Sequence, residues 1–303
     1  MPVITRSSSN GGRLVRMAAV AFGGLLLAAP QAQAGHNIFH IFTPAVEAGA
    51  WGAEALSAVQ FGFPAAAHED EDGHDDAAAD HEAHGHGDVR AAHEFAIHGG
   101  VTDYWMAKLA LSAERAPGDG YDLTSFASEN VFRLFAPRGG MVDAAWFAAV
   151  SVGIDSEATN AFEFGPVLSF ANGPLAITLN PFFEKTFGRN REDGMAFTYA
   201  WRATYELADQ LSIGVEGYGE IENIAHAPAA RDQVHRIGPV LYLGHVHGNP
   251  TGIHGEKHHE HGHGHEHENH AGTPEWHGEV GVLFGLTEAT PDAALKINIG
   301  ADF

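Results

Sequence analysis

The sequence contains no cysteine, which excludes disulfide bonds, thiolate metal sites and a lipoprotein anchor among its 303 residues. It is also poor in basic residues, because 16 Lys and Arg stand against 39 Asp and Glu, for a formal net charge of −23. A phosphate backbone would be repelled by such a chain. We therefore exclude nucleic acid as a partner.

Long apolar runs are scarce, and the one that occurs lies at the N-terminus. Three arginines precede an apolar stretch from Met17 to Ala29, and the small residues Ala32 and Ala34 follow it. A basic region, a short apolar core and a small-x-small site are typical of a secretory signal peptide, so we predict that residues 1–34 are cleaved. A membrane anchor is the alternative, but the core is too short and too rich in glycine. Removing three arginines and no acids would change the net charge from −23 to −26.

Alternation of polar and apolar residues is abundant, and it is clearest in the last eight residues, 296–303. Ile297, Ile299, Ala301 and Phe303 fall on one side of a period of two, and polar residues or glycine fall on the other. This period predicts a strand with one apolar and one polar face. A secreted chain that ends on an aromatic residue is typical of the closing strand of an outer-membrane β-barrel. The last strand of a soluble sheet is the alternative.

Similar alternation recurs along the chain between turn residues, and it predicts twelve strands. Asn172-Gly173 between two of them is a strong hairpin signal. An even number of strands is what bacterial single-chain barrels require. The predicted strands are residues 46–59, 93–101, 105–114, 122–135, 144–154, 162–170, 175–184, 195–206, 211–220, 235–244, 276–286 and 293–303.

Two features favour a membrane barrel over a soluble one. Twelve strands enclose more space than side chains fill, and aromatic residues cluster near strand ends, as interfacial girdles do. We therefore predict an all-β fold, an antiparallel transmembrane barrel of about twelve strands within residues 35–303. The aromatic residues at strand ends are Trp51, Tyr104, Trp105, Tyr205, Trp276 and Phe303.

Charged and polar residues opposite the apolar faces are candidates for the lining of a lumen. Their acidic excess would favour cations. For His98, a hydrogen-bonded structural role is the alternative to lining a lumen. The candidates are Glu94, His98, Lys108, Glu114, Arg202, Glu206, Glu216 and Glu220.

Three short sequence segments, together with the C-terminal strand, resemble those of a known family. They are Gly100-Val-Thr-Asp-Tyr-Trp105, Gly165-Pro-Val-Leu-Ser169 and Gly285-Leu-Thr-Glu-Ala-Thr-Pro-Asp292. Over roughly residues 90–303 the chain resembles proteobacterial outer-membrane barrels, in particular those similar to transporters of the phenol meta-degradation pathway. The resemblance implies an outer-membrane location and a transport role. The long histidine tracts are not part of this pattern.

Sixteen of the 22 histidines lie in two acidic tracts, at residues 68–88 and 245–277. Imidazole is the commonest protein ligand for zinc, copper and nickel, and His-rich tracts are a compositional signal of metal binding. We expect labile sites for Ni, Zn, Cu or Co and no tightly bound cofactor. Acidic linkers or a pH-sensitive brush are the alternatives. The candidate ligands are His68, His74, His81, His84, His86, His245, His247, His254, His258, His259, His261, His263, His265, His267 and His270.

The number of predicted strands that precede each histidine tract predicts the side of the membrane on which the tract lies. If both termini are periplasmic, the first tract is extracellular and the second faces the periplasm. His36 and His40, near the mature N-terminus, could add a metal site, but a free tail is the simpler interpretation.

The leading hypothesis is a barrel in contact with outer-membrane lipid that binds divalent transition metals through its loops and passes metal ions or small solutes. A generic porin or hydrophobic-solute channel and a soluble periplasmic metal-binding protein are alternatives. A lipid-modifying enzyme is a further one, but no nucleophile-elbow or zincin motif is present, so we predict no enzyme. The sequence gives no oligomeric state.

Overall fold

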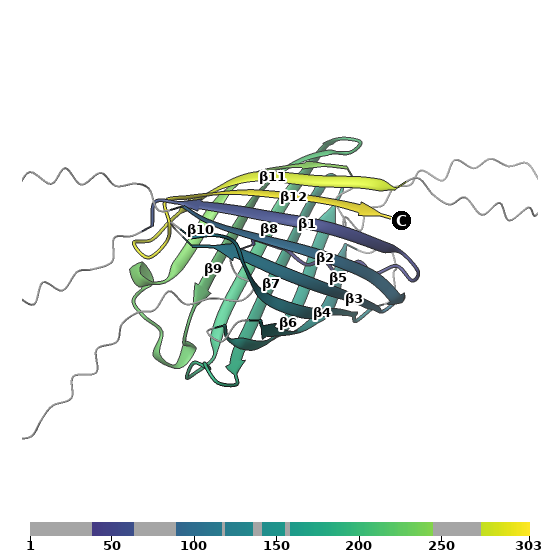
Figure 1. Cartoon of the computed structure of the whole chain (residues 1–303). Helices are drawn as coiled ribbons and strands as arrows, with labels where there is room; N and C mark the ends of the chain where they lie inside the picture. Colours follow the sequence, from purple (N-terminus) through teal and green to yellow (C-terminus); the bar gives the residue numbers. More distant parts are fainter. Residues whose placement is uncertain (1–37, 64–88, 117–118, 136–140, 155–157, 245–273) are drawn as a thin grey trace, which may run out of the picture. The chain divides into compact units, whose positions relative to one another are not determined.

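The computed structural model describes residues 38–63, 89–116, 119–135, 141–154, 158–244 and 274–303. The predicted signal peptide and the densest parts of both histidine tracts lie outside these residues, so the cleavage site and the fifteen candidate metal ligands stay predictions. Within the described residues the chain forms twelve antiparallel strands that close into one barrel (Figure 1). The predicted fold class and number of strands are confirmed.

The strands follow the predicted ranges closely, because the alternation in the sequence is continuous along each of them. Two short 3-10 helices, η1 (Ile224–His226) and η2 (Ala230–Asp232), lie between β9 and β10. No helix within the described ranges is long and apolar enough to cross a membrane. The strands are β1 Trp51–Phe61, β2 Arg90–Thr102, β3 Trp105–Arg115, β4 Asp122–Arg133, β5 Val142–Gly153, β6 Asn160–Asn172, β7 Leu175–Phe187, β8 Ala196–Ala208, β9 Leu211–Ile221, β10 Val234–Leu243, β11 Glu275–Gly285 and β12 Ala293–Asp302.

The terminal strand closes the barrel against the first one, as predicted. β12 pairs with β1 from Gly52 opposite Asp302 to Phe61 opposite Ala293, and each of the other strands pairs with its neighbours in sequence. The start of the first strand was predicted too early, since β1 begins at Trp51 and residues 46–50 lie outside it. The only contact of strand type in that stretch is an isolated bridge between Ala48 and Gly100.

The two ends of the barrel carry different connections. We call the end with Trp51 and Phe303 the C-terminal end and the other the loop end. At the C-terminal end β2–β3, β6–β7 and β8–β9 are joined by only two residues each. The β6–β7 turn uses Gly173 at a φ of 60°, a conformation that glycine adopts at little cost. The strand ends that flank the two histidine tracts lie at opposite ends of the barrel.

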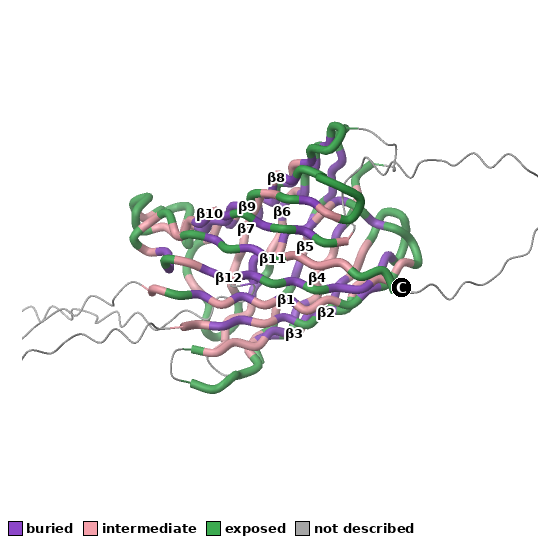
Figure 2. The backbone as a smooth tube through the Cα atoms, turned by 90° about the horizontal axis from the view of Figure 1, so that it is seen from above, coloured by how far each residue is buried: buried purple, intermediate pink, exposed green. Residues whose placement is uncertain are grey.

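Burial alternates along the strands (Figure 2), and charged side chains are found on their buried face. In β12, Ile297 and Ile299 are 39% and 53% exposed, whereas Lys296 and Asn298 between them are 1% and 8% exposed. A soluble barrel would show the reverse order. The apolar outer face therefore faces lipid, and this is a transmembrane barrel of the bacterial outer-membrane type.

The predicted aromatic girdle lies at one end of this lipid-facing surface. Trp51, Tyr205, Trp276 and Phe303 are each at least half exposed and belong to the C-terminal end. Their rings have an apolar body, and Trp and Tyr add a polar atom, which suits the boundary between lipid and water.

Candidate functional site: an occupied lumen

The barrel lumen is occupied by the chain's own N-terminal segment, residues 38–48, which we call the lumen segment. Its residues contact inward-facing side chains of β3, β5, β7, β9 and β10, which surround the interior. Ile38, Phe39, Ile41 and Phe42 are at most 8% exposed. The segment passes between these strands and meets β2 at the C-terminal end through Ala48 and Gly100. The free tail expected around His40 was therefore wrong, and His36 lies outside the described residues.

Asn180 on β7 holds the middle of the lumen segment. Its amide Nδ2 donates to the Phe42 carbonyl at 3.0 Å, and its Oδ1 accepts from the Phe42 N–H at 2.7 Å. Both backbone groups of Phe42 are thus satisfied without a neighbouring strand. Asn180 is 1% exposed, so water does not compete for these bonds.

The ring of Phe42 lies against an apolar patch on the inner face of β5, β6 and β7. Its centroid is 4.3 Å from that of Phe147 and 6.2 Å from that of Phe182, and those two rings stack at 4.5 Å. Val167 completes the patch and is fully buried. Burial of a side chain of this size contributes about 1.5–3 kcal/mol, so Phe42 is an anchor of the segment.

A first lysine cluster lies beside the segment. The ammonium group of Lys108 lies 2.6 Å from Glu54, 2.9 Å from Glu94 and 3.2 Å from Glu129. It also lies 3.2 Å from Nδ1 of His40, which accepts this hydrogen bond. Three carboxylates around one lysine leave an acidic excess in the lumen wall.

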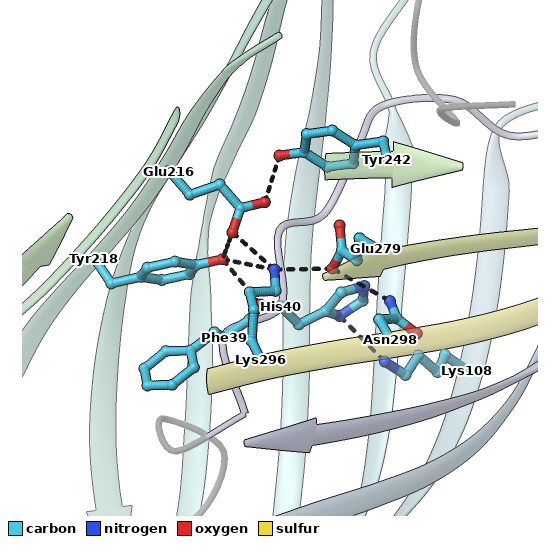
Figure 3. Close-up of polar contacts among 9 residues, drawn as sticks. All are labelled: Phe39, His40, Lys108, Glu216, Tyr218, Tyr242, Glu279, Lys296 and Asn298. Carbon is cyan, nitrogen blue, oxygen red and sulfur yellow. Dashed lines mark hydrogen bonds and ion pairs between the residues drawn. The ribbon is translucent and has the colours of Figure 1, made fainter. Parts of the chain in front are cut away.

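A second lysine cluster lies across β9–β12 (Figure 3). Lys296 contacts Glu216 at 2.7 Å and Glu279 at 2.8 Å. Glu216 accepts further hydrogen bonds from the hydroxyls of Tyr242 and Tyr218, each at 2.6 Å. The Tyr218 hydroxyl also lies 2.9 Å from the carbonyl oxygen of Phe39, so this cluster too contacts the lumen segment.

A cavity of about 270 Å³ remains between the lumen segment and the loop end. The segment contributes Ile38, Phe39, His40 and Phe42 to its lining. Four carboxylates and two arginines also line it. Arg236 is engaged, since it donates to Gln60 at 3.2 Å and lies over the ring of Phe39 at 4.8 Å. The charged lining residues are Glu94, Glu129, Glu163, Glu220, Arg90 and Arg236.

At the C-terminal end two histidines share one carboxylate. Nε2 of His98 lies 3.2 Å from one oxygen of Asp302, and Nδ1 of His277 lies 3.3 Å from the other. His98 thus faces Asp302 in the structure. Among the residues that the structure describes, no group of three or more His, Asp or Glu side chains is arranged to hold a metal ion.

The loop end carries acidic side chains outside the membrane-spanning strands. Burial, the Glu220 carboxylate and Lys185 act on Glu192, and their net effect raises its pKa above the ordinary value. Burial and the carboxylates of Glu220 and Glu192 likewise raise the pKa of Glu222. Three carboxyl groups, those of Glu192, Glu220 and Glu222, therefore interact at the loop end.

The structure brings most of the sequence-predicted lumen residues to the inner face. Glu94, Lys108, Arg202, Glu216 and Glu220 are buried there, and His98 faces Asp302. Glu114 is partly exposed near the loop end and Glu206 is exposed at the C-terminal end, and both have interaction partners.

Sequence reasoning missed several residues of the site. Glu54 and Glu129 lie in the two strands with the weakest alternation. Asn180 and Phe42 could not be paired, because nothing local connects positions so far apart. The one signal was the apolar run Ile38-Phe39-His40-Ile41-Phe42, which is unusual for a free tail.

A family model described as "Putative MetA-pathway of phenol degradation" matches residues 155–244, which contain β6 to β10. The match covers less than half of the chain and agrees with the resemblance in strands and turns. No curated protein sequence matches the chain.

Among solved structures, the chain is similar to the COG4313 outer membrane channel from Pseudomonas putida F1. The TM-score is 0.54 at 10% sequence identity, over 90% of this chain and 100% of that one. The translocator domain of the autotransporter NalP from Neisseria meningitidis follows with a TM-score of 0.41 at 9% identity, over 85% and 89% of the two chains. At 10% identity, the similarity to the COG4313 channel supports the barrel fold alone.

Proposed function

We propose that the protein is an outer-membrane channel for small solutes whose lumen segment closes the pore and must move for a solute to pass. The proposal rests on the position of residues 38–48 inside the lumen. This segment is bonded to Asn180 through Phe42 and reaches Gly100 at the C-terminal end through Ala48. The similarity in fold to the COG4313 outer membrane channel from Pseudomonas putida F1 supports it.

The attachment of the segment suits a reversible closure. Asn180, Tyr218 and Lys108 hold it by hydrogen bonds, and Phe42 and Phe39 hold it by packing. Each of these contacts contributes on the order of 1–3 kcal/mol. The segment belongs to the same chain as the wall, so it returns to its site without diffusing away.

Small cations and neutral polar molecules are the solutes that the lumen favours. The two lysine clusters place five carboxylates around two lysines, and the cavity adds Glu163 and Glu220. Rings of carboxylates favour cations in pores.

The orientation follows from the connections. Two-residue turns characterise the periplasmic end of bacterial barrels, so we place the C-terminal end in the periplasm. A solute would enter the cavity from outside the cell, and the lumen segment would block its way to the periplasm.

Asn180→Ala tests the channel proposal, with Thr178→Ala as its control. Thr178 lies on the same face of β7 but bonds to Ser169 at 3.1 Å. Loss of two hydrogen bonds costs about 2 kcal/mol, which shifts the ratio of closed to open channels roughly 30-fold. We expect a higher open probability in planar bilayers for Asn180→Ala only. Equal open probabilities for both variants and the wild type would contradict the proposal.

Metal binding through the histidine tracts is the second part of the proposal, and it rests on the sequence. β10 ends at Leu243 and β11 begins at Glu275, both at the C-terminal end, where His98 and His277 share Asp302. Nickel, zinc and copper titrations should show fewer bound ions when residues 245–273 are deleted. Equal binding by both proteins would exclude a role for this tract.

A further inference from the structure

The wall between β6 and β7 is interrupted at mid-height. The two strands pair from Asn160 opposite Phe187 to Phe164 opposite Phe183, and pairing resumes only at Leu168 opposite Leu179. This register sets Pro166 directly opposite Pro181. Proline has no N–H, so neither residue can donate a hydrogen bond to the other. We call this stretch the proline seam.

The interruption is confined to the seam. β5 pairs with β6 without a break past Pro166, and β7 pairs with β8 without a break past Pro181. Every backbone group in a lipid-facing wall needs a partner from within the protein. The two missing donors therefore weaken the β6–β7 pair at this point.

Two further features lie beside the seam. Glu163 and Glu184 lie opposite each other, three residues from the two prolines on the side of the loop end, and like charges in facing positions disfavour a strand pair. Gly165 lies so close to the carbonyl oxygen of Pro181 that a Cβ would collide with it. The two backbones are thus in direct contact, with no side chain between them at this point.

An apolar surface lines the seam from inside. Val167 and Phe182 flank the two prolines and join Phe147 in the patch that holds the ring of Phe42. The two lysine clusters, by contrast, give other parts of the lumen wall a charged surface. The lumen cavity reaches this patch, since Phe42, Asn180 and Phe182 are part of its lining.

The outer side of the seam is apolar as well. Leu168 and Leu179 are 39% and 44% exposed on the lipid-facing surface beside the two prolines. An apolar solute at the Phe42 site would thus be separated from lipid only by a strand pair that lacks two donors.

A second break in strand pairing, between β10 and β11, differs from the proline seam in one respect. Pro239 lies there opposite Val282, so one of the two facing residues retains its N–H. It serves as an internal control, because it also carries a lipid-facing proline.

We propose that the proline seam is a lateral exit through which a small uncharged apolar solute, of about the size of one aromatic ring, passes from the lumen into the membrane. The solute takes the site that Phe42 vacates against Phe147, Val167 and Phe182, and the seam parts beside it. This inference rests on the proposed displacement of the lumen segment and adds a solute class and a path that the channel proposal does not need.

The test restores the missing donors with Pro166→Val and Pro181→Val together, and Pro239→Val is the matched control. Folding is checked by the shift in gel mobility between unheated and heated samples. Uptake of radiolabelled toluene is measured in Gram-negative cells that express each full-length variant, and ionic conductance is measured in planar bilayers. We expect toluene uptake of the double variant to fall to the rate of cells without the protein, with conductance unchanged.

A second variant guards against misfolding of the first. Leu168→Cys with Leu179→Cys places a reversible link across the seam, and the chain has no other cysteine. Uptake should be low when the pair is oxidised and should recover on reduction. Undiminished uptake in either the double proline variant or the oxidised pair would overturn the lateral exit, as would an equal loss of uptake and conductance. Failure of the channel proposal would show separately, as a conductance that does not respond to Asn180→Ala.

Discussion

Lys296 is the residue on which the second lysine cluster depends, because it neutralises two carboxylates in a place that water does not reach. Its side chain is 2% exposed and that of Glu216 is 0% exposed. Removing one partner of such a pair leaves an uncompensated buried charge. The cluster also contacts the carbonyl of Phe39 through Tyr218, so its loss would disturb both the wall and the lumen segment.

Lys296→Met should destabilise the barrel by about 3–5 kcal/mol. Arg231→Ala is the control, since Arg231 and Asp232 form a pair whose side chains are 71% and 50% exposed. Exposed pairs contribute about 0–1 kcal/mol. Urea unfolding followed by gel mobility gives both values. Similar urea midpoints for the two variants would contradict the expected cost of leaving Glu216 and Glu279 without their buried cation.

The raised pKa values of Glu192 and Glu222 predict a dependence of stability on pH. An acid whose pKa is higher in the folded state binds more protons there, so its contribution to stability falls as pH rises above the unfolded value. Glu192→Gln with Glu222→Gln should therefore gain stability over wild type at pH 8 and not at pH 4. Solvent screening keeps the gain below about 1 kcal/mol per residue. Equal differences at the two pH values would contradict the assignment.

At the scale of elements, alternation in the sequence was enough to predict each strand to within a few residues, including the closing pair β1–β12. Such patterns work because each strand here has one face in lipid and one in a polar interior. They failed at residues 46–50, where Gly49 takes a positive φ of 82° and the chain turns from the lumen into the wall.

The lumen segment could not be predicted as an element, since it has no regular hydrogen-bonding pattern of its own. Its partners Asn180, Tyr218 and Lys108 lie far away in sequence and on three different strands. Contacts between residues so far apart produce no repeating pattern of polar and apolar residues in the sequence. Only the burial of its apolar run follows from physical chemistry alone.

Gly100 sits where the lumen segment meets the wall, and it tests that junction. A Cβ there would collide with the carbonyl oxygen of Glu47, and the Gly100 backbone exchanges hydrogen bonds with Gly49 and Ala50 at 2.8 and 2.9 Å. Gly100→Ala should push the segment out of place and raise the open probability in bilayers. Gly120→Ala, where a Cβ meets nothing within 4 Å, should leave it unchanged. A closed channel in both variants would mean that this junction does not hold the segment.

At the scale of the whole molecule, the interior charge predicts ion selectivity. Glu163 lines the cavity and lies outside both lysine clusters, so Glu163→Gln should lower the ratio of potassium to chloride permeability without loss of folding. Asp103→Asn, in an exposed turn at the C-terminal end, removes the same charge away from the cavity. Reversal potentials in a salt gradient measure both. A selectivity that follows net charge alone would change equally in the two variants.

A reversible tether between the lumen segment and the wall gives the sharpest test of whether residues 38–48 close the pore. Phe42→Cys with Asn180→Cys supplies the only two thiols in the chain, one on the segment and one on the wall that holds it. Single-channel conductance is recorded before and after treatment with a short reducible thiol cross-linker, and again after reduction. We expect frequent opening of the untreated protein, persistent closure once the link is formed and recovery after reduction. A conductance that stays the same whether or not the link is present would contradict it.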